Sequence, residues 1–221
     1  AILFDLVTSA SSIHGAYWME GAGGIFCENR AMDWLVSLTG MPQGAFGVFT
    51  SGGTAANLSA MVTARETWRN NGGISDKKGI IITSVGAHSS IKAMAKVIDA
   101  EVRLVDTEDR MSGEALAADI AAMSAEERQC LFAVVGTGGT TNAGIVDDLE
   151  GILGVCEREN LWFHVDAAYG GGALVADSVR DLFRGIEGAD SVTIDPHKWL
   201  FSPYDCGAII YKNRDLAREA H

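Results

Sequence analysis

The stretch that decides the fold runs from residue 161 to residue 211 and reads LWFHVDAAYGGGALVADSVRDLFRGIEGADSVTIDPHKWLFSPYDCGAIIY. It holds three short apolar runs rich in β-branched and aromatic residues, at 161–165, 191–194 and 207–211. Runs of this length, bounded by Gly, Pro and Asp, are typical of buried strands. A helical pattern at 177–184 separates the first two runs. Strands that alternate with helices predict βα units and therefore a mainly parallel sheet.

The same alternation extends through the rest of the chain. Further strands are expected at FGVF (46–49), GIIIT (79–83), VRLV (102–105) and LFAVV (131–135), about seven in all. Further helices are expected at 28–39, 54–69, 89–98, 112–123 and 147–158. Thr54 is the natural N-cap of the helix at 54–69. Because no repeat or linker interrupts the pattern, we predict one α/β domain over residues 1–221.

Composition narrows the class of protein. A chain of 221 residues with 48% hydrophobic content can bury one large core. Its apolar runs are shorter than the roughly 20 residues that span a bilayer. The first residues, AILFDLV, lack the basic region of a signal peptide. The net charge of −12 disfavours a nucleic-acid partner, which needs a basic face. These features favour a soluble cytoplasmic protein.

The cysteines indicate the redox state of the protein, and the ends of the sequence indicate its completeness. The sequence contains four cysteines, Cys27, Cys130, Cys156 and Cys206. They lack CxxC or metal-ligand spacing, so we expect free thiols in a reducing compartment, with neither a disulfide nor a metal site. The chain begins at Ala1 without an initiator methionine and stops at His221 inside a helical pattern. We therefore expect a fragment of a longer protein.

Unusual residues follow several of the expected strands. In open α/β sheets, ligands bind at the carboxyl ends of the strands, so chemistry is expected there. The segments concerned are SGGT (51–54), AHSS (87–90), GTGGTTNAG (136–144), DAAYGGG (166–172) and DPHKW (195–199).

Lys198 and Asp166 are the strongest candidates for catalysis. Lys198 follows a strand among bulky apolar neighbours, which would desolvate its ammonium group and lower its pKa toward nucleophilic use. The alternative is a surface lysine whose stem lies along Trp199. Asp166 ends the strand LWFHVD, where a carboxylate can hold a pyridinium proton. Its alternative is a helix-cap or turn aspartate.

The remaining motifs are weaker by themselves. SGGT before a helix predicts an anion site for a phosphate, or else a plain turn with an N-cap. It matches neither GxGxxG nor GxxxxGK[ST], which disfavours nucleotide binders. His88 can lie flat over a bound ring, or it can cap a helix. Thr140 and Thr141 can reach a cofactor ring or make turn hydrogen bonds, and His164 is interpreted as a structural histidine.

Taken in order, the motifs resemble those of the group II pyridoxal-phosphate decarboxylases. The segments that carry the resemblance are SGGTAANLSA, AHSSIKAMAK, GTTNAGIVDDL, FHVDAAYGGGAL and DPHKWLFSPYDCG. Relatives include aromatic-amino-acid, glutamate and diaminobutyrate decarboxylases. The resemblance implies the large domain of a fold-type I pyridoxal-phosphate enzyme, with a mainly parallel seven-stranded sheet flanked by helices. It also implies a homodimer in the full-length protein.

The resemblance transfers roles to particular residues. Lys198 would form the Schiff base with pyridoxal 5'-phosphate, and Asp166 would pair with the pyridine nitrogen. His88 would stack on one face of the ring, while Ala168 would pack on the other.

Four further positions match cofactor contacts of the family. Gly53 and Thr54 match the positions that bind the phosphate, Thr141 matches a threonine close to the ring, and His197 matches the histidine before the lysine. The chain departs from the family pattern because the N-terminal segment and the small C-terminal domain are absent. The family has a mobile loop whose tyrosine protonates the intermediate after carbon dioxide leaves. This loop would lie beyond His221.

The function implied is decarboxylation of an L-amino acid to an amine and carbon dioxide. One alternative is another reaction of the same cofactor, such as desulfuration, aldol cleavage or transamination, since the lysine and the aspartate fix the cofactor and not the bond that breaks. A second alternative is a catalytically silent fragment. The sequence does not identify the amino-acid substrate.

Overall fold

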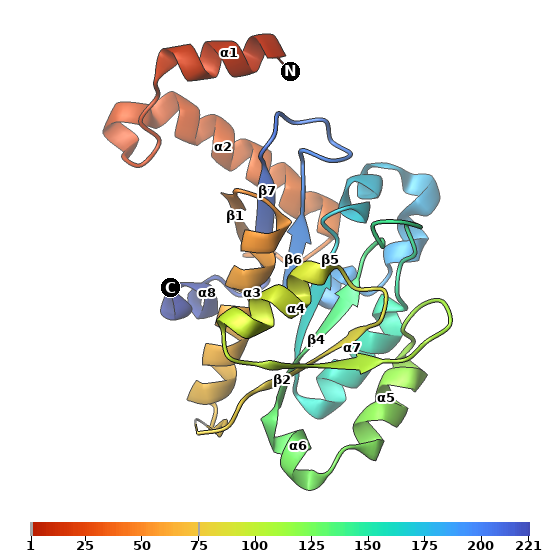
Figure 1. Ribbon diagram of the computed structural model, residues 1–221. Helices are drawn as coiled ribbons and strands as arrows, with labels where there is room; N and C mark the ends of the chain where they lie inside the picture. Colours follow the sequence, from red (N-terminus) through yellow and green to blue (C-terminus); the bar gives the residue numbers. More distant parts are fainter. Residues whose placement is uncertain (1, 75) are drawn as a thin grey trace.

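A seven-stranded sheet forms the centre of the protein, seen here in a computed structural model that describes residues 2–74 and 76–221 (Figure 1). The strands are β1 (Phe46–Thr50), β2 (Ile80–Ser84), β3 (Glu101–Val105), β4 (Leu131–Thr137), β5 (Trp162–Asp166), β6 (Ser191–Ile194) and β7 (Gly207–Tyr211). Each matches a strand expected from the sequence to within two residues at either end. Short apolar runs between turn residues therefore located the whole sheet.

The sheet has the strand order β1-β7-β6-β5-β4-β2-β3. From β6 to β3 all neighbours are parallel, whereas β7 is antiparallel to both β6 and β1. The expectation of a mainly parallel sheet is thus confirmed. Thr137, Asp166 and Thr193 are register partners on β4, β5 and β6. The carboxyl ends of these three strands consequently meet at one edge.

Helices cover both faces of the sheet. The α-helices are α1 (Ile2–Ser11), α2 (Trp18–Thr39), α3 (Gly53–Asn70), α4 (Ser89–Val97), α5 (Gly113–Ala122), α6 (Ala125–Cys130), α7 (Leu149–Glu159) and α8 (Arg214–Ala220). Three 3₁₀ segments are η1 (Gly170–Val175), η2 (Asp177–Phe183) and η3 (Ile186–Gly188). The helix expected at 177–184 is thus a 3₁₀ helix. In addition, α2 starts ten residues before the expected position 28, at Trp18.

The core is divided by the sheet into two apolar clusters. One contains side chains of α2, α5 and α7, such as Leu35, Leu116 and Ile152. The other contains side chains of α3 and α4, such as Met61 and Ile91. A three-layer arrangement follows, in which burial on both faces explains why the strands read as continuous apolar runs.

The N-terminal helix lies apart from these layers. Every residue of α1 is exposed, including Leu3, Phe4 and Leu6, and Figure 1 shows the helix beyond the first half of α2, away from the sheet. Among the described residues, no helix is both long and apolar enough to cross a membrane.

Candidate active site

A cavity of about 340 Å³ opens at the carboxyl edge of the sheet. Its wall contains residues from all five of the segments that follow strands in the sequence. All eight predicted site residues line it: Gly53, Thr54, His88, Thr141, Asp166, Ala168, His197 and Lys198. The fold thus brings together residues that lie up to 145 positions apart (198 − 53) in the chain.

The start of α3 forms one end of the cavity. Gly52 precedes the helix with φ of 141°, a conformation that favours glycine. The predicted N-cap at Thr54 is therefore wrong, because Gly52 occupies the cap position and Thr54 lies within the first turn. A glycine cap leaves the first backbone N–H groups of the helix without a side-chain acceptor, which suits an anion.

Gly53 is packed against two residues that are distant in sequence. A Cβ atom at Gly53 would lie 2.9 Å from Oδ2 of Asp195 and 3.0 Å from Cβ of Ala168. The absence of a side chain therefore keeps this end of the cavity open.

Asp166 lies at the floor of the cavity with only 6% of its surface exposed. The backbone N–H of Ala168 donates to Oδ1 (3.2 Å), and the amide Nδ2 of Asn57 donates to Oδ2 (2.9 Å). Burial raises the pKa of the Asp166 carboxyl. The two hydrogen bonds oppose that rise, as do the nearby basic side chains of His88 and Lys198. A cation placed beside Asp166 would further stabilise the ionised form.

Lys198 meets a second carboxylate of the cavity, that of Asp195. Its Nζ lies 3.1 Å from Oδ2 of Asp195, and its side chain is 35% exposed. The expected desolvation by bulky neighbours is therefore wrong. Trp199 turns away to pack at 5.1 Å against the ring of Tyr169. The lysine is held instead by an ion pair with a carboxylate that is 3% exposed.

Asp195 was missed as a separate site residue, although it opens the DPHKW motif. Its Oδ1 is buried and has no hydrogen-bond partner among residues 2–74 and 76–221. The same holds, within these ranges, for Oγ1 of Thr137, which also lines the cavity. Buried polar atoms are normally paired, so both atoms offer contacts to a bound molecule.

The two histidines of the cavity are fixed through Nδ1. His88 is the N-cap of α4, and its Nδ1 accepts from the backbone N–H of Ser90 (3.2 Å). His197 Nδ1 accepts from the backbone N–H of Cys206 (2.8 Å). The capping role of His88 is thus confirmed, and its ring also lines the cavity, while stacking on a bound ring stays a prediction.

The two threonines of the glycine-rich loop differ. Oγ1 of Thr140 accepts from the backbone N–H of Ile145 (3.1 Å), which is the turn role. Thr141 is exposed at the rim of the cavity.

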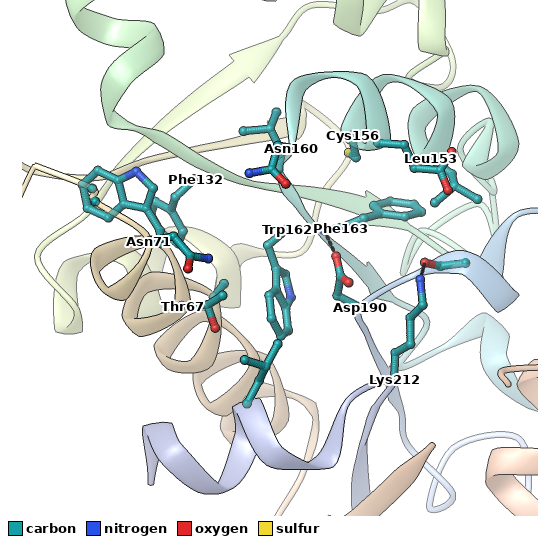
Figure 2. Close-up of a pocket in the computed structure, with 18 of the residues that line it drawn as sticks. Thr67, Asn71, Phe132, Leu153, Cys156, Asn160, Trp162, Phe163, Asp190 and Lys212 are labelled. Carbon is teal, nitrogen blue, oxygen red and sulfur yellow. Dashed lines mark hydrogen bonds between the residues drawn. The ribbon is translucent and has the colours of Figure 1, made fainter. Parts of the chain in front are cut away.

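A larger cavity, of about 690 Å³, lies at the opposite edge of the sheet (Figure 2). Two of its charged side chains are already engaged in internal hydrogen bonds. Asp190 accepts from the backbone N–H of Phe163 (2.8 Å), and Lys212 donates to the carbonyl of Gly188 (3.1 Å). The smaller cavity is the better candidate, because it combines the amine of Lys198, the buried acid Asp166 and the N-terminus of α3.

Comparison with known proteins decides the family. A profile of the "Pyridoxal-dependent decarboxylase conserved domain" matches residues 1–221. The chain belongs to the pyridoxal-dependent decarboxylase family. It is 34% identical to an aromatic-L-amino-acid decarboxylase of Bacillus atrophaeus, over 96% of the chain and 44% of that protein. It is 36% identical to an L-2,4-diaminobutyrate decarboxylase of Rhizobium meliloti, over 97% of the chain and 43% of the relative.

Solved structures of the decarboxylase family share the fold. The crystal structure of mouse CSAD superposes with a TM-score of 0.91 at 31% identity, covering all of this chain and 48% of that one. The expected fold class, a fold-type I large domain, is thereby confirmed. The chain spans about half the length of the decarboxylases that it matches.

The cavity fits the cofactor of pyridoxal-dependent decarboxylases. It has an amine at Lys198, a buried acid at Asp166 and a glycine-lined helix start at Gly53. The unpaired oxygen of Thr137 adds a further polar contact. These groups match an aldehyde, a pyridine nitrogen and a phosphate in chemical type.

Proposed function

We propose that this chain is the cofactor-binding large domain of an amino-acid decarboxylase that uses pyridoxal 5'-phosphate. The observation that carries the proposal is the gathering of Lys198, Asp166 and the start of α3 around one cavity. The protein would convert an L-amino acid to its amine and carbon dioxide, as a carboxy-lyase. When bound, the cofactor supplies an electron sink for the bond that breaks.

Different residues of the cavity would hold different parts of the cofactor. Lys198 would hold the cofactor covalently through Nζ, which Asp195 keeps at the wall of the cavity by an ion pair. Asp166 holds a proton at the pyridine nitrogen, because a buried carboxylate favours a neighbouring cation. His88 and Ala168, which both line the cavity, would contact the ring.

The other predicted residues hold the rest of the cofactor. Gly53 and Thr54 would bind the phosphate with backbone N–H groups and the Thr54 hydroxyl, because the helix dipole favours an anion at this position. Thr141 would contact the ring from the rim, and His197 lines the cavity near the lysine.

Labelling of the lysine tests this assignment. The chain loaded with pyridoxal phosphate should show a visible absorption band that borohydride abolishes, and peptide mapping should place the label on Lys198. Lys198→Ala should lose both the band and the label. Lys212→Ala is the matched control, because that lysine borders the cavity at the opposite edge, and it should label normally. A label on Lys92 in the unaltered chain would refute the assignment.

We also propose that the whole protein is a cytoplasmic homodimer in which residues 1–221 form an incomplete large domain. Free thiols at all four cysteines support a reducing compartment. Exposed apolar side chains on α1, together with the exposed Phe201 and with Tyr204 at the cavity, support a protein interface. Light scattering on a longer chain that includes a C-terminal domain should give the mass of a dimer, and a monomer at micromolar concentration would contradict this.

A further inference from the structure

Asn57 lies one turn into α3 and is 1% exposed. Its Nδ2 lies 2.9 Å from Oδ2 of Asp166 and 3.2 Å from Oγ of Ser90. Its Oδ1 lies 3.0 Å from Nε2 of His164. Both sides of the amide are thus engaged in hydrogen bonds inside the protein. Asn57 was not among the residues predicted to act in catalysis or to contact the cofactor, although it lies within the motif SGGTAANLSA.

These hydrogen bonds form a network that runs from the indole of Trp162 to the carboxylate of Asp166, and its carboxylate end determines the direction of each bond. Trp162, at the wall of the larger cavity (Figure 2), donates its indole N–H to Oγ of Ser191 (2.9 Å). An indole can only donate and an ionised carboxylate can only accept. Asp166 accepts from the amide N–H of Asn57, so Asn57 Oδ1 faces His164. Nδ1 of His164 accepts the hydroxyl proton of Ser191 (2.8 Å), and the imidazole's own proton lies on Nε2, from which it is donated to Asn57 Oδ1.

A second branch leaves the same amide. The other N–H of Asn57 points to Oγ of Ser90, and this oxygen lies 2.9 Å from Nδ1 of His88. Since Ser90 accepts from Asn57, its own hydroxyl proton is free for His88. The amide is consequently connected both to the floor of the cavity and to the histidine at its wall.

We propose that Asn57 is a positioning residue of the cofactor site, which sets the place of the Asp166 carboxylate and, through Ser90, the orientation of the His88 ring. The inference rests on the proposed function, since positioning matters only if Asp166 faces the pyridine nitrogen. The neutral state of His164 agrees with it: burial lowers the pKa of this histidine to about 3.

The chemistry of an amide is required at this point. An apolar side chain would leave Oδ2 of Asp166 and the N–H of His164 buried without partners. An aspartate would place a second carboxylate within hydrogen-bond distance of the first, which disfavours the ionised form of both.

The variant Asn57→Leu tests the proposal, with Thr63→Val as the matched control. Thr63 is a buried polar residue of the same helix whose hydroxyl donates to the carbonyl of Ser59 (3.1 Å). Loss of a hydrogen bond to a charged group should weaken pyridoxal phosphate binding by roughly tenfold or more in Asn57→Leu. With ¹⁵N-labelled cofactor, the pyridine nitrogen signal should move toward its unprotonated value. Thr63→Val should change neither. Unaltered affinity and an unaltered nitrogen signal in Asn57→Leu would overturn the proposal.

A second measurement needs no cofactor. In the chain without pyridoxal phosphate, ¹⁵N NMR of the histidine side chains should show His164 neutral with its proton on Nε2. A proton on Nδ1 would overturn the proposal, because Asn57 would then face His164 with its nitrogen and Asp166 with its oxygen. If neither the unaltered chain nor Thr63→Val binds pyridoxal phosphate, the proposed function fails, and the tautomer of His164 alone decides whether Asn57 is oriented as described.

Discussion

Replacement of His164 by glutamine should make the protein more resistant to mild acid. His164 is fully buried, and burial lowers its pKa from 6.5 to about 3. In the window between these values, the unfolded chain binds a proton that the folded chain excludes. The wild-type protein must therefore lose stability as the pH falls through 6.5 toward 3. Glutamine has no such titration, and its amide N–H can replace Nε2 as a donor to Asn57.

The size of the effect follows from the two pKa values. With 6.5 in the unfolded state and about 3 in the folded state, linkage gives a loss of about 2 kcal/mol between pH 7 and pH 5. Buried carboxyls with raised pKa values, such as Asp147 and Asp190, act in the opposite direction. They contribute equally to wild type and variant, so the difference between the two proteins isolates His164.

Urea unfolding, followed by tryptophan fluorescence at pH 7 and pH 5, measures this difference. His14→Gln provides the baseline, since His14 is 64% exposed. We expect wild type and His14→Gln to lose about 2 kcal/mol more than His164→Gln over this interval. Equal losses in all three proteins would refute the claim that His164 is held neutral by burial.

Four further variants probe the cofactor site and the scaffold separately. Gly53→Ala should weaken pyridoxal phosphate binding, because its Cβ would lie 3.0 Å from Ala168 Cβ. In Gly154→Ala, where the new methyl group has only an ordinary contact at 3.6 Å, titration of the absorption band should show normal binding. Asp166→Asn should bind the cofactor yet abolish most carbon dioxide release in a full-length protein, and near-normal turnover would leave the carboxylate with a structural role. Ser124→Ala removes the capping box of α6 and should cost about 1 kcal/mol in urea unfolding, without any change in cofactor affinity.

The strands were predictable because each is a short apolar run bounded by turn residues, and their buried faces leave little freedom in pattern. The start of α2 could not be predicted, because the three glycines Gly21, Gly23 and Gly24 disfavour a helix before residue 28. The structure accommodates them with a kink, where Gly21 has φ of −127° and ψ of 21°. The helix α6 carried a signal that went unused: Ser124 and Glu127 have the spacing of a capping box.

The sequence could predict which residues line the candidate site, but it could not predict the contacts that these residues make. Residues that follow parallel strands must converge at one edge, which is why Lys198 and Asp166 line one cavity. The partner of Lys198 depends on the turn that brings Asp195 back toward it, and sequence neighbours such as Trp199 suggested a different environment. The role of Asn57 depends on contacts with residues more than 100 positions away, at His164 and Asp166.

The alternation of side chains along β5 has a consequence for how such chains can change in length. Trp162, His164 and Asp166 point to the face covered by α3, whereas Phe163 and Val165 pack in the cluster on the other face. An insertion or deletion of one residue within the strand would exchange the two sets, because successive side chains point to opposite faces. The carboxylate, the imidazole and the indole would then enter an apolar cluster. Gains and losses of residues should therefore be tolerated in the loops on either side of β5, and not within its five positions.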